Sequence, residues 1–117
     1  MKSCALASAV VLLFVAAPST GSTAEFFSGA KLFEICTAGE QGSDTGYMFC
    51  SGYISGIHDL LSDPAKHETC MPDDVVLAEM QAGVIGFLRD NPELLDFGAA
   101  GLVKKALVLK YPCTKKL

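Results

Sequence analysis

The sequence predicts a small all-α protein, a four-helix domain stapled by two disulfides. Apolar residues recur every three or four positions in four separate segments, as they do on the buried face of a helix. No segment alternates between apolar and polar residues over several positions, which is the pattern of a half-buried strand. An even number of cysteines follows an export signal, and in a small exported domain this indicates disulfides.

The N-terminus has the pattern of a secretory signal peptide. A short basic start precedes an almost unbroken apolar run over residues 5–17, and small residues at the −3 and −1 positions fit cleavage before Glu25. The run is shorter than the roughly 20 residues that a bilayer span needs, which disfavours an uncleaved anchor. We therefore expect residues 1–24 to be removed, and residues 25–117 to form one exported domain with no membrane segment.

The exported chain is moderately acidic. Cleavage removes Lys2 but no acidic residue. The exported chain therefore keeps 13 acidic and eight basic residues, and its net charge changes from −4 to −5. The remaining lysines are too dispersed to form a nucleic-acid-binding surface. An acidic surface of this size favours solubility and fits a basic protein partner.

The first helix is expected over residues 28–36, with Ser28 as its N-cap. Its apolar face consists of Leu32, Phe33 and Cys36. Residues 37–46 contain three glycines together with serine, threonine and aspartate, a composition that is typical of a loop. We therefore expect a flexible, polar connection between the first two helices.

The second helix is expected over residues 47–61, with Asp44 or Thr45 as its cap. Its apolar stripe consists of Tyr53, Ile57, Leu60 and Leu61. Residues 62–72, S-D-P-A-K-H-E-T-C-M-P, contain two prolines and many polar residues. This composition predicts a second loop.

Two glycines within the second helix need a reason, because glycine in a helix interior costs about 1 kcal/mol relative to alanine. Gly52 and Gly56 are four positions apart and share one face of the helix. We interpret them as a helix-packing seam that lets another helix approach closely, flanked by Tyr53 and Ile57. They do not form a phosphate-binding loop, since no strand precedes them and no Lys-Ser/Thr follows.

The third helix is expected to start near Asp73, where acidic residues suit the helix N-terminus, and to end near Asp90 because a proline follows. Residues 93–97 should form a turn whose apolar side chains fill the core. These side chains are Leu94, Leu95 and Phe97. The fourth helix is expected over residues 98–111. Short connections predict that neighbouring helices pack antiparallel.

The four cysteines of the exported chain, Cys36, Cys50, Cys70 and Cys113, allow three pairings. Cys50 and Cys70 should lie roughly 20 Å apart along the second helix, beyond disulfide reach. An antiparallel third and fourth helix would place Cys70 beside Cys113, which leaves Cys36 with Cys50. The remaining pairing, Cys36–Cys70 with Cys50–Cys113, requires a folded-over topology and stays open.

The stretch C-S-G-Y-I-S-G-I-H-D, from Cys50 to Asp59, has the composition of a catalytic site. However, a nucleophilic cysteine must be a free thiolate, and Cys50 belongs to an even set in an exported chain. His58 and Asp59 are adjacent, so they should point about 100° apart on a helix. A zinc site formed by His58 and His67 with Cys50 and Cys70 would have no recognised spacing. We therefore predict no enzyme, no metal and no cofactor, and assign His58 no role.

Three stretches in a fixed order carry a resemblance. Cys50-Ser-Gly-Tyr-Ile-Ser-Gly-Ile-His-Asp is similar to the motif C-x-G-Y-I-x-G-x-x-D. Cys70-Met-Pro-Asp and the later Phe87-Leu-Arg-Asp-Asn-Pro-Glu are similar to C-x-P and L-x-x-(H/N)-P-E. The end, from Leu102-Val103 to Tyr111-Pro112-Cys113, is similar to L-V-x-x-A-L and F-P-C, with tyrosine where phenylalanine is usual. By these motifs the chain resembles the Rap/Tai family of type VI secretion immunity proteins.

This resemblance implies a small periplasmic helical protein that binds and inhibits a peptidoglycan-cleaving amidase effector. Several members of the family are dimers, so it also implies a homodimer as one assembly of this chain. The alternative from another functional class is a small periplasmic stress chaperone, or a general periplasmic binding protein without an effector partner.

If the chain is an inhibitor, its two polar loops are the expected partner-binding surface, because loops on a disulfide-fixed frame are preorganised. The alternative is that both loops are merely solvated connections. The candidate contact residues are Glu40, Gln41, Asp44, Asp63, Lys66, His67 and Glu68.

Overall fold

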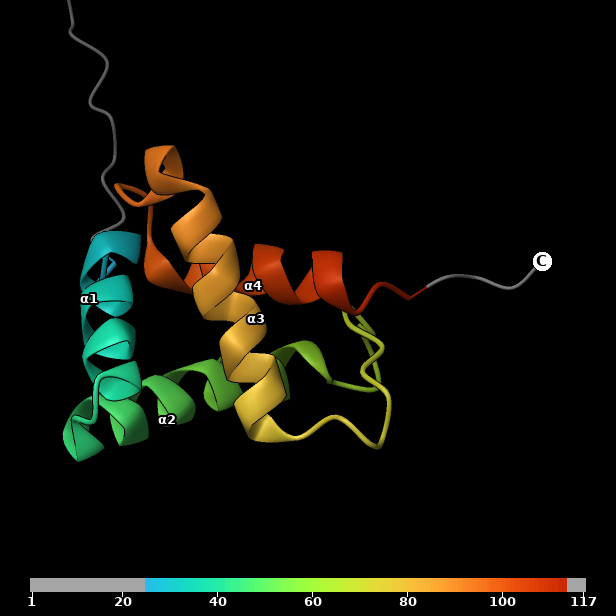
Figure 1. The fold of residues 1–117 in the computed structure, drawn as a ribbon. Coiled ribbons are helices and arrows are strands. Elements are labelled where there is room, and N and C mark those ends of the chain that lie inside the picture. The colour runs from blue at the N-terminus through green and yellow to red at the C-terminus, as the bar shows by residue number, and fades with distance from the viewer. Residues whose placement is uncertain (1–24, 114–117) are drawn as a thin grey trace, which may run out of the picture.

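The structure, a computed structural model, describes residues 25–113. The predicted signal peptide lies outside the described residues, so cleavage before Glu25 stays a prediction. Four α-helices and one short 3-10 helix make up the described part of the chain, which contains no strand (Figure 1). The elements are α1 (Gly29–Glu40), α2 (Asp44–Leu61), α3 (Leu77–Asp90), η1 (Pro92–Leu94) and α4 (Ala99–Lys110). The predicted all-α fold class is confirmed.

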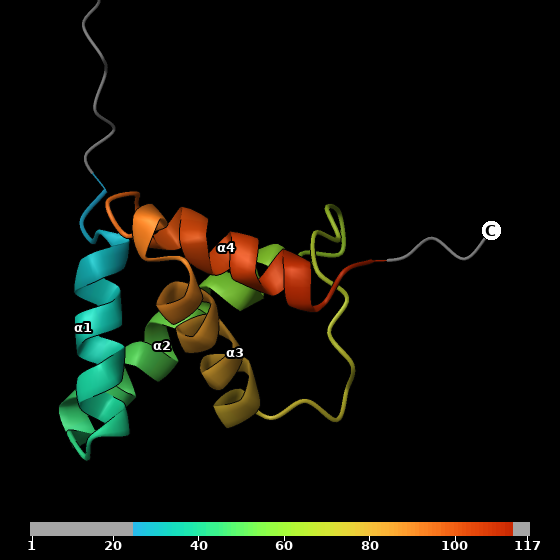
Figure 2. The ribbon, with the colours of Figure 1, turned by 45° about the horizontal axis from the view of Figure 1, so that its top comes forward.

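Consecutive helices cross one another steeply instead of lying antiparallel. In Figure 1, α1 descends, α2 runs across from its lower end, α3 rises back, and α4 again runs across. Figure 2 shows the same arrangement after rotation, with α2 and α4 running in the same general direction. The expectation of antiparallel neighbours was therefore wrong. Short connections limit how far apart helix ends lie, but the interdigitation of side chains sets the crossing angle.

The corner between α1 and α2 is shorter than predicted, because both helices extend into the expected loop. Only residues 41–43 connect them. Ser28 caps α1 as predicted, and its Oγ accepts a hydrogen bond from Lys31 N at 3.2 Å. The cap of α2 is Ser43, whose Oγ accepts from Gly46 N at 3.1 Å, and not Asp44 or Thr45.

Two of the glycines assigned to that loop are in fact the close-packing residues of the domain. A Cβ added at Gly39 would lie 2.7 Å from Tyr47 N, and one at Gly46 would lie 2.8 Å from Ile35 O. Both contacts are with backbone atoms, which cannot move aside easily. Glycine at these positions lets α1 and α2 approach within backbone contact.

The predicted packing seam on α2 is not occupied by another helix of the described chain. Gly52 and Gly56 are exposed, and a Cβ built on either would meet no atom of the described residues within 4 Å. Within residues 25–113, their assignment to close packing against another helix of the chain was therefore wrong. The flanking residues Tyr53 and Ile57 are half-buried and pack against the core from the side.

α3 begins four residues later than predicted and ends where predicted. Asp73 and Asp74 precede it in an irregular segment, where Val75 N donates to Pro72 O at 3.2 Å. The subsequent turn, η1, brings Leu94 and Leu95 against the core, but Phe97 is exposed and does not fill the core as expected. The extent of α4 agrees with the prediction within one residue.

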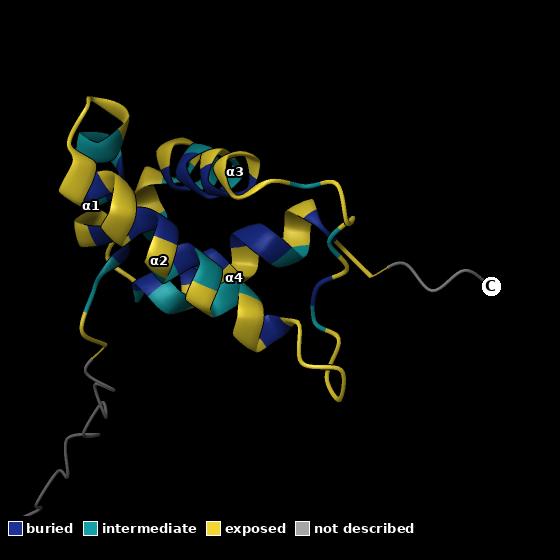
Figure 3. Cartoon of the chain, turned by 90° about the horizontal axis from the view of Figure 1, so that it is seen from below, coloured by how far each residue is buried: buried dark blue, intermediate teal, exposed yellow. Residues whose placement is uncertain are grey.

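All four helices contribute to one core, seen as dark-blue helix faces turned toward each other in Figure 3. Its largest fully buried side chains are Leu32, Ile54, Ile85, Leu88 and Leu107. One buried polar pair crosses it, in which Ser51 Oγ donates to Gln81 Oε1 at 2.6 Å. None of the helices in residues 25–113 is long and apolar enough to cross a membrane.

Both predicted disulfides are present. Cys36 bonds to Cys50 with an S–S distance of 2.02 Å, and Cys70 bonds to Cys113 with 2.00 Å. The geometric reason for the second pair differs from the one expected. Cys70 does not stand at the start of α3; it lies in an extended segment that runs beside the end of α4, where Cys70 N donates to Tyr111 O at 3.0 Å.

Candidate functional site

The predicted contact residues fall into two regions at opposite ends of α2, an 18-residue helix that is about 27 Å long. The first region is the corner between α1 and α2, and the second is the connection formed by residues 62–76 (Figure 1). The structure therefore does not bring all seven predicted residues together. Each region has to be considered as a surface of its own.

The corner is held in part by Glu40, which was predicted to lie in a partner-binding loop. Glu40 and Asp44 lie in α1 and α2 and not in a loop. Glu40 Oε2 accepts from Arg89 Nη2 at 2.8 Å, which ties α1 to the end of α3, and Arg89 Cζ also lies 5.9 Å from the centroid of the Phe33 ring. Gln41 and Asp44 remain exposed.

The connection after α2 starts with a tight turn built on Asp63. Its Oδ1 accepts from Ala65 N at 2.8 Å, and its carbonyl oxygen accepts from Lys66 N at 2.9 Å and from His67 N at 3.0 Å. His67 closes the turn with φ of 44°, in the left-handed region where histidine is one of the more tolerated residues. The backbone thus fixes the position from which the His67 ring projects.

Beyond the turn, the connection is attached to both α2 and α4. Glu68 N donates to Leu61 O at 3.2 Å, and the Glu68 carboxylate forms an ion pair with Lys104. Lys66 is exposed. Of the four predicted residues in this region, Asp63 and Glu68 therefore shape the connection, whereas Lys66 and His67 present their side chains at its surface.

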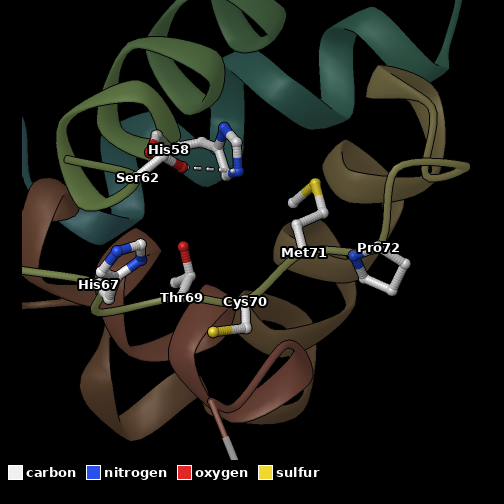
Figure 4. A pocket seen from close by; sticks show the side chains of 7 residues that line it. All are labelled: His58, Ser62, His67, Thr69, Cys70, Met71 and Pro72. Atoms are coloured by element: carbon white, nitrogen blue, oxygen red, sulfur yellow. Dashed lines mark hydrogen bonds between the residues drawn. The ribbon is translucent and has the colours of Figure 1, made fainter. Parts of the chain in front are cut away.

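A pocket of about 420 Å³ lies between the end of α2 and this connection (Figure 4). It is lined by His58, Ser62, His67, Thr69, Cys70, Met71 and Pro72. Three of these residues, His58, His67 and Cys70, were considered as site residues in the sequence. The others could not be assigned from sequence, because they meet only when residues 68–72 extend alongside the end of α2.

His58, which the sequence left without a role, orients Ser62 at the mouth of this pocket. Ser62 Oγ donates to His58 O at 2.9 Å, and it lies 3.1 Å from His58 Nε2. The Ser62 hydroxyl is therefore held between the carbonyl oxygen and the ring of His58. His58 Nδ1 lies 3.6 Å from Asp59 Oδ1, so the adjacent pair does meet, but Asp59 is 83% exposed and the contact is weak.

An aromatic cluster on the outer side of α2 was not predicted as a unit. Phe27, Phe49 and Tyr53 have ring centroids 5.2 to 6.1 Å apart. Burial, and secondarily the Glu25 carboxylate, raises the pKa of the Tyr53 hydroxyl above its usual value. The four-residue spacing of Phe49 and Tyr53 was a visible signal, whereas the position of Phe27 depends on the tertiary fold.

The cysteines of the two candidate chemical sites are both oxidised. Cys50 is bonded to Cys36 and Cys70 to Cys113, so neither thiolate is available as a nucleophile or as a zinc ligand. Within residues 25–113, no three His, Cys, Asp or Glu side chains are grouped so that they could hold a metal ion.

Comparison with known protein families identifies the chain. The family model of the Rap1a immunity proteins matches residues 28–113, which is most of the chain and nearly all of its described part. The chain belongs to the Rap1a immunity protein family. Among curated proteins, none matches this Rap1a-family chain. The resemblance seen in its three motifs is thereby confirmed.

Membership of the Rap1a family fixes the kind of site to expect. An immunity protein acts by binding a protein effector. The functional site of this Rap1a-family chain is accordingly a protein-binding surface. The exposed parts of the corner, the connection and the outer side of α2 are the surfaces that it offers.

Proposed function

We propose that this Rap1a-family chain works in the periplasm, where it binds and inhibits a peptidoglycan-cleaving amidase effector of a type VI secretion system. The observation that carries this proposal is the family match across residues 28–113. The N-terminal signal pattern and the two disulfides support an oxidising, exported location.

Within this proposal, the connection of residues 62–76 is the better candidate for effector contact than the corner. The corner uses Glu40 for the Arg89 ion pair and its glycines for backbone packing. The connection instead presents Lys66 and His67 from a backbone that is fixed by the Asp63 turn and by the Cys70–Cys113 disulfide. A preorganised polar surface of this kind loses little conformational entropy on binding.

The test begins with a search for an amidase reading frame beside the gene of this chain, followed by an assay of whether the chain protects a sensitive host against that amidase. Periplasmic amidase should lyse the host, co-export of the chain should prevent lysis, and the purified pair should form a stoichiometric complex that no longer cleaves peptidoglycan. A Lys66→Ala/His67→Ala variant should bind more weakly, whereas Gln41→Ala in the corner should not. If no hydrolase is retained from the periplasm and lysis is unaffected, the proposal fails.

A homodimer is a second part of the proposal. The exposed side of α2, where Met48, Gly52, Gly56 and Leu60 follow one another at four-residue intervals, is apolar and unoccupied by other described residues. Light scattering coupled to size exclusion measures the assembly directly. A dimer that becomes monomeric in Gly56→Glu would support this surface, and a monomeric parent protein would reject it.

The alternative, a periplasmic stress chaperone, is favoured by the exposed apolar side chains at Phe26, Met48, Leu60 and Phe97. A chaperone should suppress aggregation of many unfolded clients, most strongly at low pH. An immunity protein should bind one enzyme stoichiometrically at neutral pH. Light scattering of an aggregating client at both pH values separates these two functions.

A further inference from the structure

We propose that the pocket between α2 and the connection binds a basic side chain, arginine or lysine, from the protein partner. The proposal rests on the proposed function in one respect, namely that the partner is a protein. It adds which chemical group of the partner is recognised, and by which residues of this chain. The deciding observations are an unpaired buried hydroxyl, the charges around the pocket and its apolar wall.

The unpaired hydroxyl belongs to Thr69. This residue is only 5% exposed, and no group among residues 25–113 forms a hydrogen bond with its Oγ1. Figure 4 shows the oxygen pointing into the space between His67 and the His58–Ser62 pair. An unsatisfied buried polar group is unfavourable and rare in proteins. A ligand that donates a hydrogen bond into the pocket would satisfy it.

The charges around the pocket favour a cation. Asp59 follows His58, Asp63 follows Ser62, and two further acidic residues follow Pro72. α2 ends at Leu61, so the partial negative charge of its C-terminus lies at the pocket. Lys66 is a basic neighbour, but Lys104 is already neutralised by its ion pair with Glu68. An anionic ligand would meet repulsion from most of these groups.

The apolar wall favours a cation that is carried on a hydrocarbon stem. Met71 and Pro72 line the side of the pocket opposite the polar residues (Figure 4). Arginine and lysine pack their methylene groups on apolar surface while their charged ends stay in polar surroundings. A volume of about 420 Å³ is within the range of pockets that enclose small ligands, and it accommodates one such side chain.

The experiment is an NMR titration of the oxidised protein with three acetylated and amidated tripeptides, at constant ionic strength. The peptides are Gly-Arg-Gly, its neutral isostere with citrulline, and Gly-Glu-Gly. The arginine peptide should produce saturable shifts at the amides of His67, Thr69 and Met71, and the other two should not. Equal shifts with arginine and citrulline, stronger shifts with glutamate, or no shifts at all would each overturn the proposal.

Thr69→Val tests the hydroxyl directly, since it removes the oxygen while keeping the shape of the side chain. It should weaken binding of the arginine peptide by about tenfold or more, because a hydrogen bond to a charged group contributes at least that much to affinity. Thr37→Val is the matched control, because the Thr37 hydroxyl donates to Phe33 O within its own helix. Unchanged affinity in Thr69→Val overturns the proposal.

A second variant covers the case in which Thr69→Val does not fold. Asp59→Asn removes the exposed charge beside His58 and should weaken binding of the arginine peptide about twofold to threefold. Unchanged affinity in that variant contradicts the charge argument. These results are separable from the proposed function: an amidase can be inhibited without a basic residue in this pocket, and the peptide can bind whatever the partner enzyme is.

Discussion

The two ends of α2 are each secured by one disulfide, but the disulfides sit in opposite environments. At the first end, Cys36 and Cys50 are fully buried and belong to the core, next to a turn of only three residues. At the second end, Cys70 and Cys113 are exposed, and they fasten the long connection of residues 62–76 to the end of α4.

The corner is therefore a structural part of the domain, whereas the connection can accept changes in its side chains. At the corner, backbone contacts at Gly39 and Gly46 leave no room for other side chains. The connection instead is surface chain whose position is set by a few hydrogen bonds and one exposed disulfide. Binding residues are often found on such loops, because their side chains can vary without disturbing the core.

The largest expected effect is the loss of the buried disulfide. Cys36→Ala/Cys50→Ala should lower the free energy of unfolding by about 4–5 kcal/mol: roughly 3 from closure of a loop with a sequence separation of 14, and the rest from the lost packing of two buried sulphurs. The Tm should fall by about 20–30 °C. Calorimetry measures both, and a smaller loss than for the surface pair would contradict the comparison.

The surface disulfide provides the contrast. Its sequence separation of 43 predicts a larger entropic stabilisation, about 4 kcal/mol by chain entropy alone. However, no cavity forms in Cys70→Ala/Cys113→Ala, and the connection can detach while the helices stay packed. We expect a loss of about 2–4 kcal/mol, with faster hydrogen exchange confined to residues 62–76. Faster exchange throughout α1 and α2 would show that both disulfides belong to one cooperative unit.

The fold class and the cysteine pairing could be predicted because they depend on features that the sequence displays locally. Helical periodicity marks four segments, and Pro92 and Pro112 mark helix ends within one or two residues. The cysteine pairing was predicted correctly through a partly wrong topology. The distance along α2 excluded Cys50–Cys70 whatever the packing angle, but the choice between the other two pairings rested on the expected hairpin of α3 and α4. That choice was right because the extended segment at Cys70 runs beside the end of α4.

The roles of the glycines could not be predicted, because composition and spacing do not reveal tertiary contacts. Gly39 and Gly46 stand among loop-forming residues and looked like parts of a loop, yet they are helical and tightly packed. Gly52 and Gly56 have the spacing of a packing seam, yet they face outward. Helical spacing shows that residues share a face, but only the fold shows what that face meets.

The candidate pocket was also beyond prediction. His58 and His67 were visible as candidates, but Thr69 became relevant only because an extended segment buries it beside α2. That course depends on the left-handed backbone at His67 and on the bond from Cys70 to Cys113. The disulfide was predicted, but the left-handed backbone at His67 has no recognisable local pattern in the sequence.

After the two disulfides, the next largest expected effect on the free energy of unfolding comes from the glycines of α2, and it should be stabilising. In the monomer, Gly52→Ala and Gly56→Ala should each raise the free energy of unfolding by about 0.5–1 kcal/mol, because alanine favours the helix and the space around both positions is open within the chain. Gly39→Ala, the control in the tightly packed corner, should be destabilising. Chemical denaturation measures all three. Destabilisation by Gly52→Ala would indicate that this face is covered in the native assembly.

The smallest effects concern the two ion pairs, one at each end of α2. Glu40→Gln breaks the pair with Arg89, and Glu68→Gln breaks the pair with Lys104. All four side chains are partly exposed, so solvent screening limits each loss to about 1 kcal/mol or less. We expect the corner pair to matter more, because Arg89 also lies over the Phe33 ring and so is held by two contacts. Double-mutant cycles measure both coupling energies. A larger coupling at Glu68–Lys104 would mean that the connection is fixed as firmly as the corner, and that its fit to a partner is set before binding.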